Sequence, residues 1–174
     1  VHIRVNTGCF KQENNDYKLN VSLTDTQNNH VLDFSQNINK DSLVFNFRGK
    51  IKNPKLWTAE TPNLYRLEVC VVDAKGYVVQ RSNENVGIRD IRIDGFNLKV
   101  NHKPVLLRGV CLNEIDPKLG RALTYKERRQ QLEMMKAANI NFIRTAHYPF
   151  NHEFYELCDE MGFYVCNEIP FGSR

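Results

Sequence analysis

The sequence predicts a multi-domain β plus α/β fold, in which an immunoglobulin-like β-sandwich precedes the first third of a TIM (β/α)8 barrel. Up to about residue 92, short segments alternate between apolar and polar residues with a period of two, as half-buried antiparallel strands do. From there to residue 174, apolar runs alternate with stretches of helical period, which is the order of a parallel sheet with crossover helices. We therefore expect two domains, at residues 1–92 and 93–174.

The length of the chain limits how much of a barrel it can form. A complete eight-stranded barrel needs about 250 residues, with about 200 as a lower limit. The chain has 174 residues, and about half of them belong to the predicted sandwich. We therefore interpret the chain as an internal fragment of a larger protein with an incomplete barrel.

The first part contains four predicted strands and one hairpin partner. The strands are expected at residues 1–5, 17–25, 43–47 and 64–73, with 77–80 as the hairpin partner of the last. Residues 53–65 lie between two of these strands and contain Trp57, the only tryptophan of the chain. On physical grounds we expect a proline-bracketed loop in which Trp57 fills one end of the sandwich.

The second part begins with a tight turn at Asn101 and His102. Strands are then expected at residues 105–110, 140–145 and 163–166, and helices at about 124–139 and 151–161. Thr124 and Glu127 form a capping box, and Gly162 stops the second helix. The second helix also has Asn151 as its cap, and its predicted inward residues are Phe154, Leu157, Cys158 and Met161. A parallel sheet with open edges is poorly stable, so we expect this half to be mobile or to self-associate into a homo-oligomer.

Composition excludes several classes of function. No apolar stretch approaches the roughly 18 residues of a membrane span, which predicts a soluble protein without a membrane partner. The net charge of +4 comes from 24 basic and 20 acidic residues that are interspersed, which argues against nucleic acid as a partner. No targeting signal is visible, so the cytoplasm and the periplasm both stay open. The five cysteines are widely spaced in apolar contexts, and we expect buried free thiols: Cys9, Cys70, Cys111, Cys158 and Cys166.

The most specific motif is the run NFIRTAHYP at residues 141–149. It has the form of a buried strand that presents an Arg, a His and a Tyr at its carboxyl end, which is where α/β barrels build their active sites. An aromatic pair, an aspartate and a glycine follow at Phe154, Tyr155, Asp159 and Gly162. Together these residues closely resemble the signature of glycoside hydrolase family 2, which contains β-galactosidases, β-glucuronidases and β-mannosidases.

Three further segments resemble the same family in the same order. LWTAETPNLY at residues 56–65 is similar to a stretch of the family's sandwich domain. VGIR at residues 86–89 and NHKPVLLRGV at residues 101–110 are similar to its entry into the barrel, with His102 where glycine is usual. The resemblance therefore covers residues 53–165 well and is weak over residues 1–50.

The resemblance implies a function and a set of site residues. It implies a retaining exo-β-glycosidase, most like a β-galactosidase, that hydrolyses terminal β-glycosidic bonds of carbohydrates without a cofactor. Arg144 matches the arginine that supports the nucleophilic carboxylate, His147 matches a histidine that contacts the sugar, and Asn113 stands where a substrate-facing histidine is common. Glu168, Asp116, Arg121 and Tyr148 are candidates for a supporting layer around them.

The catalytic glutamates of the resembled family lie on later strands, so no catalytic residue is expected within the chain, and the chain alone is expected to be inactive. Asn167 and Glu168 form an Asn-Glu pair, but its place at the end of the third strand corresponds to a family Asp-Glu pair. Residues 169–172 lack the Glu-x-His that binds magnesium in some relatives, so no metal ligand is expected.

Three alternatives stay open. In the first, Arg144 closes a structural salt bridge and His147 is a turn histidine with its hydrogen bonds satisfied. In the second, the protein is a non-catalytic carbohydrate-binding or interaction module in which the sandwich is the working part and the barrel is degenerate. In the third, the protein is a non-catalytic barrel relative that has lost the later glutamates.

Overall fold

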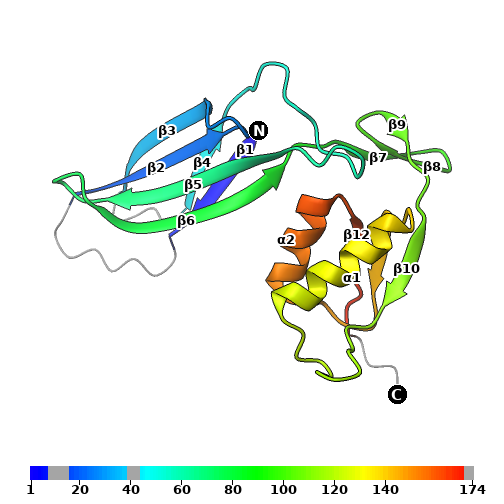
Figure 1. Ribbon diagram of the computed structural model, residues 1–174. Coiled ribbons are helices and arrows are strands. Elements are labelled where there is room, and N and C mark those ends of the chain that lie inside the picture. Colours follow the sequence, from blue (N-terminus) through cyan, green and yellow to red (C-terminus); the bar gives the residue numbers. More distant parts are fainter. Residues whose placement is uncertain (8–15, 39–43, 171–174) are drawn as a thin grey trace. The chain divides into compact units, whose positions relative to one another are not determined.

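The computed structural model describes residues 1–7, 16–38 and 44–170, and the chain forms two compact units. The first unit consists of Val1–Lys55 and Leu64–Val86, and the second of Leu56–Asn63 and Gly87–Arg174. The first is built from strands, whereas the second contains strands and the two helices of the described residues (Figure 1). The segment Leu56–Asn63 therefore leaves the first unit and returns to it.

The first unit contains two antiparallel sheets. Strand β1 (His2–Asn6) pairs with β4 (Val44–Arg48). The larger sheet has the order β3-β2-β5-β6, and it is formed by β2 (Tyr17–Thr24), β3 (His30–Ile38), β5 (Leu64–Val72) and β6 (Val78–Gly87). Each strand that the sequence predicted in this part is present, although residue 43 lies outside the described residues.

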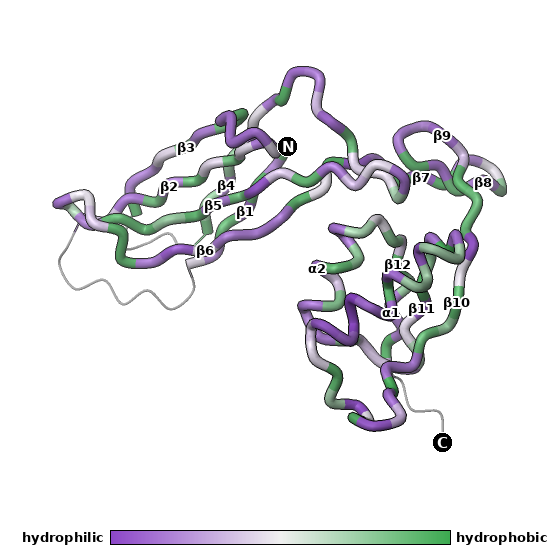
Figure 2. Tube along the Cα trace, viewed as in Figure 1, coloured by the Kyte–Doolittle hydropathy of each residue, from purple (hydrophilic) through white to green (hydrophobic). Residues whose placement is uncertain are grey.

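Alternate residues of these strands share one core. Leu19, Val21 and Leu23 of β2 are buried, while the residues between them are less so. Phe45 and Phe47 of β4 lie in the same cluster as Leu19 and Val21, so both sheets contribute to it. Strand β6 lies at the edge of the larger sheet, is exposed over most of its length and is largely hydrophilic (Figure 2).

Strand β3 was not predicted from the sequence. Its stretch from Asp33 to Asn37 is mostly polar and lacks a clear alternation. Its extended conformation is fixed by pairing with β2 along most of the length of both strands. In addition, Ser35 donates a hydrogen bond of 2.8 Å to Asn20 Oδ1. The strand therefore depends on a neighbour more than on its own pattern.

The second unit begins with a small antiparallel sheet. It is formed by β7 (Ile91–Asp94), β8 (Asn97–Val100) and β9 (Lys103–Pro104) in that order. Asn101 and His102 connect the last two with φ angles of 51° and 68°, which is the conformation of a two-residue hairpin turn. The predicted tight turn is therefore confirmed, including the unusual histidine in a left-handed position.

A parallel sheet follows, in the order β10-β11-β12. Its strands are β10 (Gly109–Leu112), β11 (Phe142–Thr145) and β12 (Tyr164–Cys166). Strand β10 lies later than the predicted 105–110, and Gly109 opens it instead of ending it. A Cβ atom on Gly109 would lie 2.2 Å from a ring carbon of Phe142, so this glycine makes room for the aromatic ring on the neighbouring strand.

Helices α1 (Tyr125–Ala137) and α2 (His152–Met161) begin at the predicted caps, and α1 ends two residues before the predicted residue 139. The Thr124 amide donates to Glu127 Oε2 at 3.0 Å, and the Phe154 amide donates to Asn151 Oδ1 at 3.2 Å. Gly162 ends α2 with a φ angle of 76°, a conformation that glycine adopts without strain.

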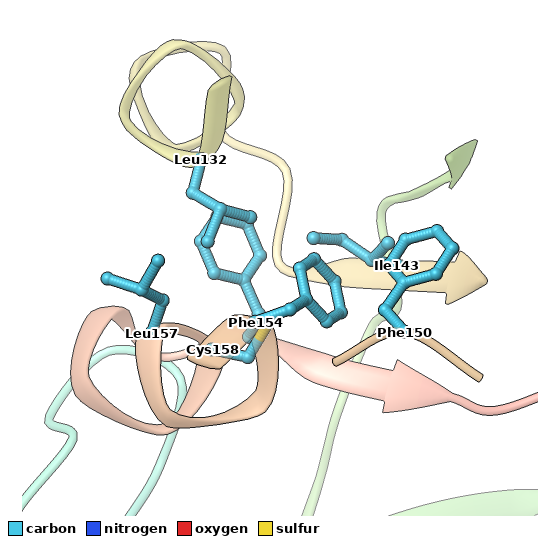
Figure 3. Close-up of a cluster of buried hydrophobic side chains, with 7 residues drawn as sticks. Leu132, Ile143, Phe150, Phe154, Leu157 and Cys158 are labelled. Atoms are coloured by element: carbon cyan, nitrogen blue, oxygen red, sulfur yellow. The ribbon is translucent and has the colours of Figure 1, made fainter. Parts of the chain in front are cut away.

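The core of the second unit lies between the parallel sheet and the two helices. Leu132 of α1 faces Phe154 of α2, and Ile143 of β11 and Phe150 lie beside them in the same cluster (Figure 3). Leu157 and Cys158 complete the buried set from α2. The predicted inward face of the second helix is therefore confirmed.

The prediction that Trp57 fills one end of the sandwich is wrong, because Trp57 belongs to the second unit. It is 1% exposed, its indole nitrogen donates to the Asp159 carbonyl at 2.8 Å, and its ring meets Tyr164 edge to face. Arg89 lies over the same ring at 4.7 Å. A buried indole requires apolar neighbours and a hydrogen-bond acceptor. Helix α2 supplies the acceptor, and strand β12 supplies the ring of Tyr164.

The prediction of buried thiols is correct for two cysteines and wrong for two others. Cys70 and Cys158 are buried, and burial raises the pKa of both thiols. Cys111 and Cys166 are exposed, because they lie on the face of the parallel sheet that the helices do not cover. Cys9 lies outside the described residues.

Candidate functional site

The parallel strands end at one edge of the sheet, and most of the predicted site residues gather there. Asn113 follows β10, His147 lies two residues beyond β11, and Glu168 lies two residues beyond β12. Arg144 is the penultimate residue of β11. Because parallel strands share their direction, side chains from three separate segments meet at this edge.

Arg144, His147 and Glu168 form one polar cluster. Arg144 Nη2 lies 2.8 Å from Glu168 Oε2, and His147 Nδ1 lies 3.3 Å from Glu168 Oε1. No group of the described residues donates a well-aligned hydrogen bond to Glu168 Oε2, so its contact with Arg144 is an ion pair. The side chain of Glu168 is 26% exposed, against 48% for Arg144 and 76% for His147. A partly sheltered carboxylate thus lies between two more exposed nitrogen groups.

Asn113, Tyr148 and Arg121 form a second group at the same edge. The Tyr148 hydroxyl lies 3.5 Å from Asn113 Oδ1, which is a long hydrogen bond. The guanidinium of Arg121 lies over the Tyr148 ring at 5.4 Å. The structure therefore links the loop after β10 to the loop after β11 through these three side chains. The peptide bond between Ala146 and His147 in the latter loop is cis.

Asp116 does not join either group. Its Oδ1 accepts hydrogen bonds from the amides of Lys118 and Leu119 at 2.8 and 3.0 Å. These amides lower the pKa of the Asp116 carboxyl. Asp116 therefore holds the turn of its own loop.

Three residues that were not among the predicted site residues hold the end of β12 in place. The Thr145 hydroxyl donates to Asn167 Oδ1 at 3.1 Å and accepts from the Glu168 amide at 3.0 Å. The Tyr155 hydroxyl donates to the same Asn167 oxygen at 2.7 Å. Thr145 is fully buried, so its hydroxyl is a polar group in the core that requires partners. In the sequence, the position of Thr145 at the end of a predicted barrel strand could have indicated that its hydroxyl bonds to a neighbouring strand end.

A buried ion pair supports the loop after β10. Arg128 Nε of α1 lies 2.5 Å from Glu114 Oε1, and both side chains are 8% exposed. Arg128 Nη1 also reaches Glu153 Oε2 of α2 at 3.1 Å. Arg128 lies four residues before Leu132 and therefore on the apolar face of the predicted helix. A charged residue on that face could have indicated a buried ion pair.

A separate cavity of about 360 Å³ lies in the second unit, lined by apolar side chains and by Trp57, Arg89 and Asp159. Arg144, His147 and Glu168 do not line it.

Within the described ranges, no three histidine, cysteine or acidic side chains are grouped closely enough to hold a metal ion. In the same part of the chain, neither helix is long and apolar enough to cross a membrane.

Bacterial proteins named beta-galactosidase match the chain over a small part of their own length. It is 46% identical over 118 residues to a protein from Vibrio vulnificus named beta-galactosidase, which covers 68% of this chain and 11% of the relative. It is 43% identical over 118 residues to a beta-galactosidase from Photobacterium profundum, covering 68% of this chain and 12% of the relative. The chain thus spans about an eighth or less of the length of these relatives.

Solved structures and family models match nearly the whole chain. The structure of Bacteroides uniformis beta-glucuronidase superposes with a TM-score of 0.81 at 31% identity, over 89% of this chain and 19% of that one. Parabacteroides merdae beta-glucuronidase gives a TM-score of 0.82 at 29% identity, over 91% and 20%. Residues 1–89 match the model of glycosyl hydrolases family 2, and residues 91–173 match that family's TIM barrel domain. The chain belongs to glycosyl hydrolase family 2.

Proposed function

We propose that this chain is part of a retaining exo-β-glycosidase that hydrolyses terminal β-galactosides. The cluster of Arg144, His147 and Glu168 at the carboxyl ends of the parallel strands carries the proposal, because a site of this kind suits the recognition of a carboxylate and of sugar hydroxyls. The proposal includes the type of each of the two units. The two antiparallel sheets are an immunoglobulin-like sandwich, and β10, β11 and β12 are the opening strands of a (β/α)8 barrel.

Arg144 is assigned to positioning. A guanidinium beside a carboxylate keeps it ionised and fixes its orientation. In the chain Arg144 Nη2 lies beside Glu168 and its Nη1 lies 3.8 Å from Cys111 Sγ, and we assign this half-exposed guanidinium to a second carboxylate on the open side of the sheet. The nucleophile and the acid/base group, which glycoside hydrolysis requires, are assigned to glutamates of later strands.

His147 and Asn113 are assigned to the sugar. His147 is exposed beyond its contact with Glu168, so its second nitrogen can meet a hydroxyl group. Asn113 can donate to or accept from a hydroxyl but cannot become charged, whereas a histidine at this place could. These two residues are oriented by Glu168, Tyr148 and Arg121. Asp116 fixes the loop that follows Asn113.

β-Galactoside is preferred to β-glucuronide as the substrate. The relatives named beta-galactosidase are 43% to 46% identical to the chain, whereas the beta-glucuronidase structures are 29% to 31% identical. A glucuronide adds a carboxylate at the sugar's C6 position, which would need an additional cation. The comparison of three chromogenic substrates, a β-galactoside, a β-glucuronide and a β-mannoside, tests this preference.

The decisive experiment uses protein expressed from the whole reading frame that encodes these residues. Arg144→Lys is expected to lower kcat on the β-galactoside by at least about tenfold, since lysine cannot form a two-pronged contact with a carboxylate. Arg129→Lys is the matched control, because Arg129 lies on the exposed side of α1 and pairs with Glu133. An unchanged kcat for Arg144→Lys, with an unchanged melting temperature, would leave Arg144 a structural residue.

The 174-residue chain alone is expected to show no turnover of any of the three substrates. Neither glutamate that the proposal assigns to catalysis lies in it, and one arginine cannot replace an acid and a nucleophile. Turnover that follows the purified chain and disappears in Glu168→Gln would show that Glu168 is the acid/base group and would contradict the assignment.

A further inference from the structure

The loop after β10 and helix α2 are connected through one buried side chain, that of Arg128. Arg128 lies near the start of α1. Its Nε lies 2.5 Å from Glu114 Oε1 in the loop after β10, and its Nη1 lies 3.1 Å from Glu153 Oε2 in the first turn of α2. Each of these two contacts leads on to a residue of the candidate site.

The first contact leads to Asn113, the residue assigned to the sugar. Asn113 and Glu114 share a tight turn, in which the Ile115 amide donates to the Asn113 carbonyl at 2.8 Å and Glu114 is the middle residue. Glu114 is buried, so its carboxylate requires a partner, and Arg128 provides it. The ion pair therefore fixes the middle of the turn from which the Asn113 side chain projects.

The second contact leads to Tyr148. Glu153 lies in the first turn of α2, directly after the loop that carries Tyr148. Ring contacts join this turn to that loop, since Phe154 meets Phe150 at 4.9 Å between ring centroids and Phe150 meets Tyr148 at 5.7 Å. The Tyr148 hydroxyl in turn lies 3.5 Å from Asn113 Oδ1. The contacts thus form a closed path that begins and ends at Asn113.

The two contacts of Arg128 differ in their surroundings. Glu114 is buried, whereas the side chain of Glu153 is half exposed. Water screens the pair with Glu153 more strongly, so the pair with Glu114 is the stronger constraint. We therefore expect Asn113 to depend on Arg128 more than Tyr148 does.

We propose that Glu114 and Arg128 are positioning residues for the sugar and that they act through Asn113. This inference rests on the proposed function, which assigns Asn113 to a sugar hydroxyl. A contact that is made equally with the bound substrate and with the transition state affects KM and leaves kcat nearly unchanged. Loss of the ion pair is therefore expected to raise KM, in contrast to Arg144→Lys, which is expected to lower kcat.

The test uses protein expressed from the whole reading frame and whichever of the β-galactoside, the β-glucuronide and the β-mannoside the wild type hydrolyses. Glu114→Gln keeps the shape of the side chain and removes its charge. It should raise KM at least about fivefold and leave kcat within about twofold of the wild type. Glu153→Gln removes the half-exposed contact and should raise KM less. Arg129→Met, on the exposed side of α1, is the control and should change neither constant.

The double variant Arg128→Met/Glu114→Gln separates positioning from stability. It leaves no unpaired charge in the core, so its melting temperature should lie closer to that of the wild type than the melting temperature of Arg128→Met alone. Its KM should nevertheless stay raised, because the connection between α1 and the loop after β10 is lost. A KM that returns to the wild-type value together with the melting temperature would overturn the proposal.

Asn113→Ala tests whether the ion pair acts through Asn113. In that background Glu114→Gln should change KM by less than about twofold, since the side chain that it positions is absent. An effect as large as in the wild-type background would contradict the proposal.

Two further outcomes distinguish this inference from the proposed function. If the wild type hydrolyses a substrate and Glu114→Gln leaves its KM unchanged, the inference alone is wrong. If the wild type hydrolyses none of the three substrates, the proposed function fails and the inference fails with it.

Discussion

Gly162 combines two constraints at a single residue. Its φ angle of 76° is one that other residues rarely adopt, and an added Cβ would lie 2.2 Å from the carbonyl oxygen of Ala59. That oxygen cannot move away freely, because it belongs to backbone and accepts a hydrogen bond of 2.9 Å from Lys136. Gly162→Ala is therefore expected to lower the free energy of unfolding by at least about 2 kcal/mol. Urea unfolding followed by circular dichroism measures the change.

Gly95→Ala separates the two constraints. Gly95 has a φ angle of 59°, but no atom lies within 4 Å of the position where its Cβ would be. Only the backbone cost of about 1 kcal/mol should then remain. Equal losses in both variants would show that the contact with Ala59 contributes nothing.

Asp159 should make the unfolding free energy depend on pH in an unusual direction. Burial raises the pKa of its carboxyl above the ordinary 3.8, and Arg89 at 3.6 Å only partly opposes this. Between the unfolded and the folded pKa, the folded chain binds more protons than the unfolded one. The contribution of Asp159 to stability is thus largest below this window and is lost as the pH rises through it. The unfolding free energy of the wild type relative to Asp159→Asn should fall as the pH rises above the ordinary carboxyl pKa of 3.8.

Asp116 provides a control of opposite sign. Backbone amides lower the pKa of its carboxyl below 3.8, so the folded chain binds fewer protons there than the unfolded one. The unfolding free energy of the wild type relative to Asp116→Asn should fall as the pH decreases through this lower range. Urea midpoints for all three proteins across the pH range measure both trends. A difference for Asp159→Asn that rises with pH would contradict the predicted direction.

Individual site residues, Glu168 among them, could be found in the sequence, but the way in which they pair could not. Arg144 and His147 stand in a motif that is contiguous along the chain. Their shared partner Glu168 lies more than twenty residues away, and only the parallel pairing of β11 with β12 brings it to them. The exposure of Cys111 and Cys166 was mispredicted for the same reason, since an apolar neighbourhood in sequence does not reveal which face of a sheet the helices cover.

At the scale of the elements, Arg128 ties helices α1 and α2 to the loop after β10. Removing it would leave Glu114, which is 6% exposed, as a buried charge without its partner. Arg128→Met is therefore expected to cost about 3–5 kcal/mol of unfolding free energy. The double variant Arg128→Met/Glu114→Gln removes the charge as well and should recover a large part of that loss. The comparison is made by urea unfolding.

Arg129→Met is the matched control for this ion pair. Arg129 is the next residue of α1, but its side chain is 45% exposed and its pairs with Glu133 and Glu160 lie at the surface. A change of less than about 1 kcal/mol is expected. A double variant that is no more stable than Arg128→Met alone would show that packing of the arginine, and not the unpaired carboxylate, explains the loss.

Elements with strong local signals were predictable, and those that depend on neighbours were not. Helix α2 has its cap at Asn151, its apolar face and its stop at Gly162 within a dozen residues, and the structure agrees at both ends. Strand β3 has no such signals and is defined by its pairing with β2. Strand β10 begins at Gly109 because the ring of Phe142 on the next strand requires the space, which no local pattern reveals.

At the scale of the whole molecule, the path of the chain departs from a simple succession of two parts. The eight residues Leu56–Asn63 belong to the second unit, although strands of the first unit lie on both sides of them in sequence. Periodicity could not show this, since it describes each segment alone. The indole of Trp57 contributes to the assignment, because its acceptor on Asp159 of the second unit lies 102 positions away along the chain.

This path predicts that Trp57→Ala weakens one unit and spares the other. The buried indole contacts Tyr164 and donates to the Asp159 carbonyl, and replacing a buried tryptophan by alanine costs about 3–5 kcal/mol. In residue-resolved hydrogen exchange, the amides of β11 and α2 should exchange at least about tenfold faster, while those of β2 and β5 should keep their rates.

Trp57→Phe is the matched control, because it retains an aromatic ring against Tyr164 while it removes the donor to Asp159 and only part of the buried ring. Its effect on the amides of β11 and α2 should be smaller, in keeping with the loss of one hydrogen bond of about 1 kcal/mol. Each unit has its own buried cluster, which is the physical reason to expect separate responses. If Trp57→Ala accelerated exchange equally in both units, the chain would unfold as one cooperative body. If it accelerated only β2 and β5, Trp57 would belong to the sandwich after all.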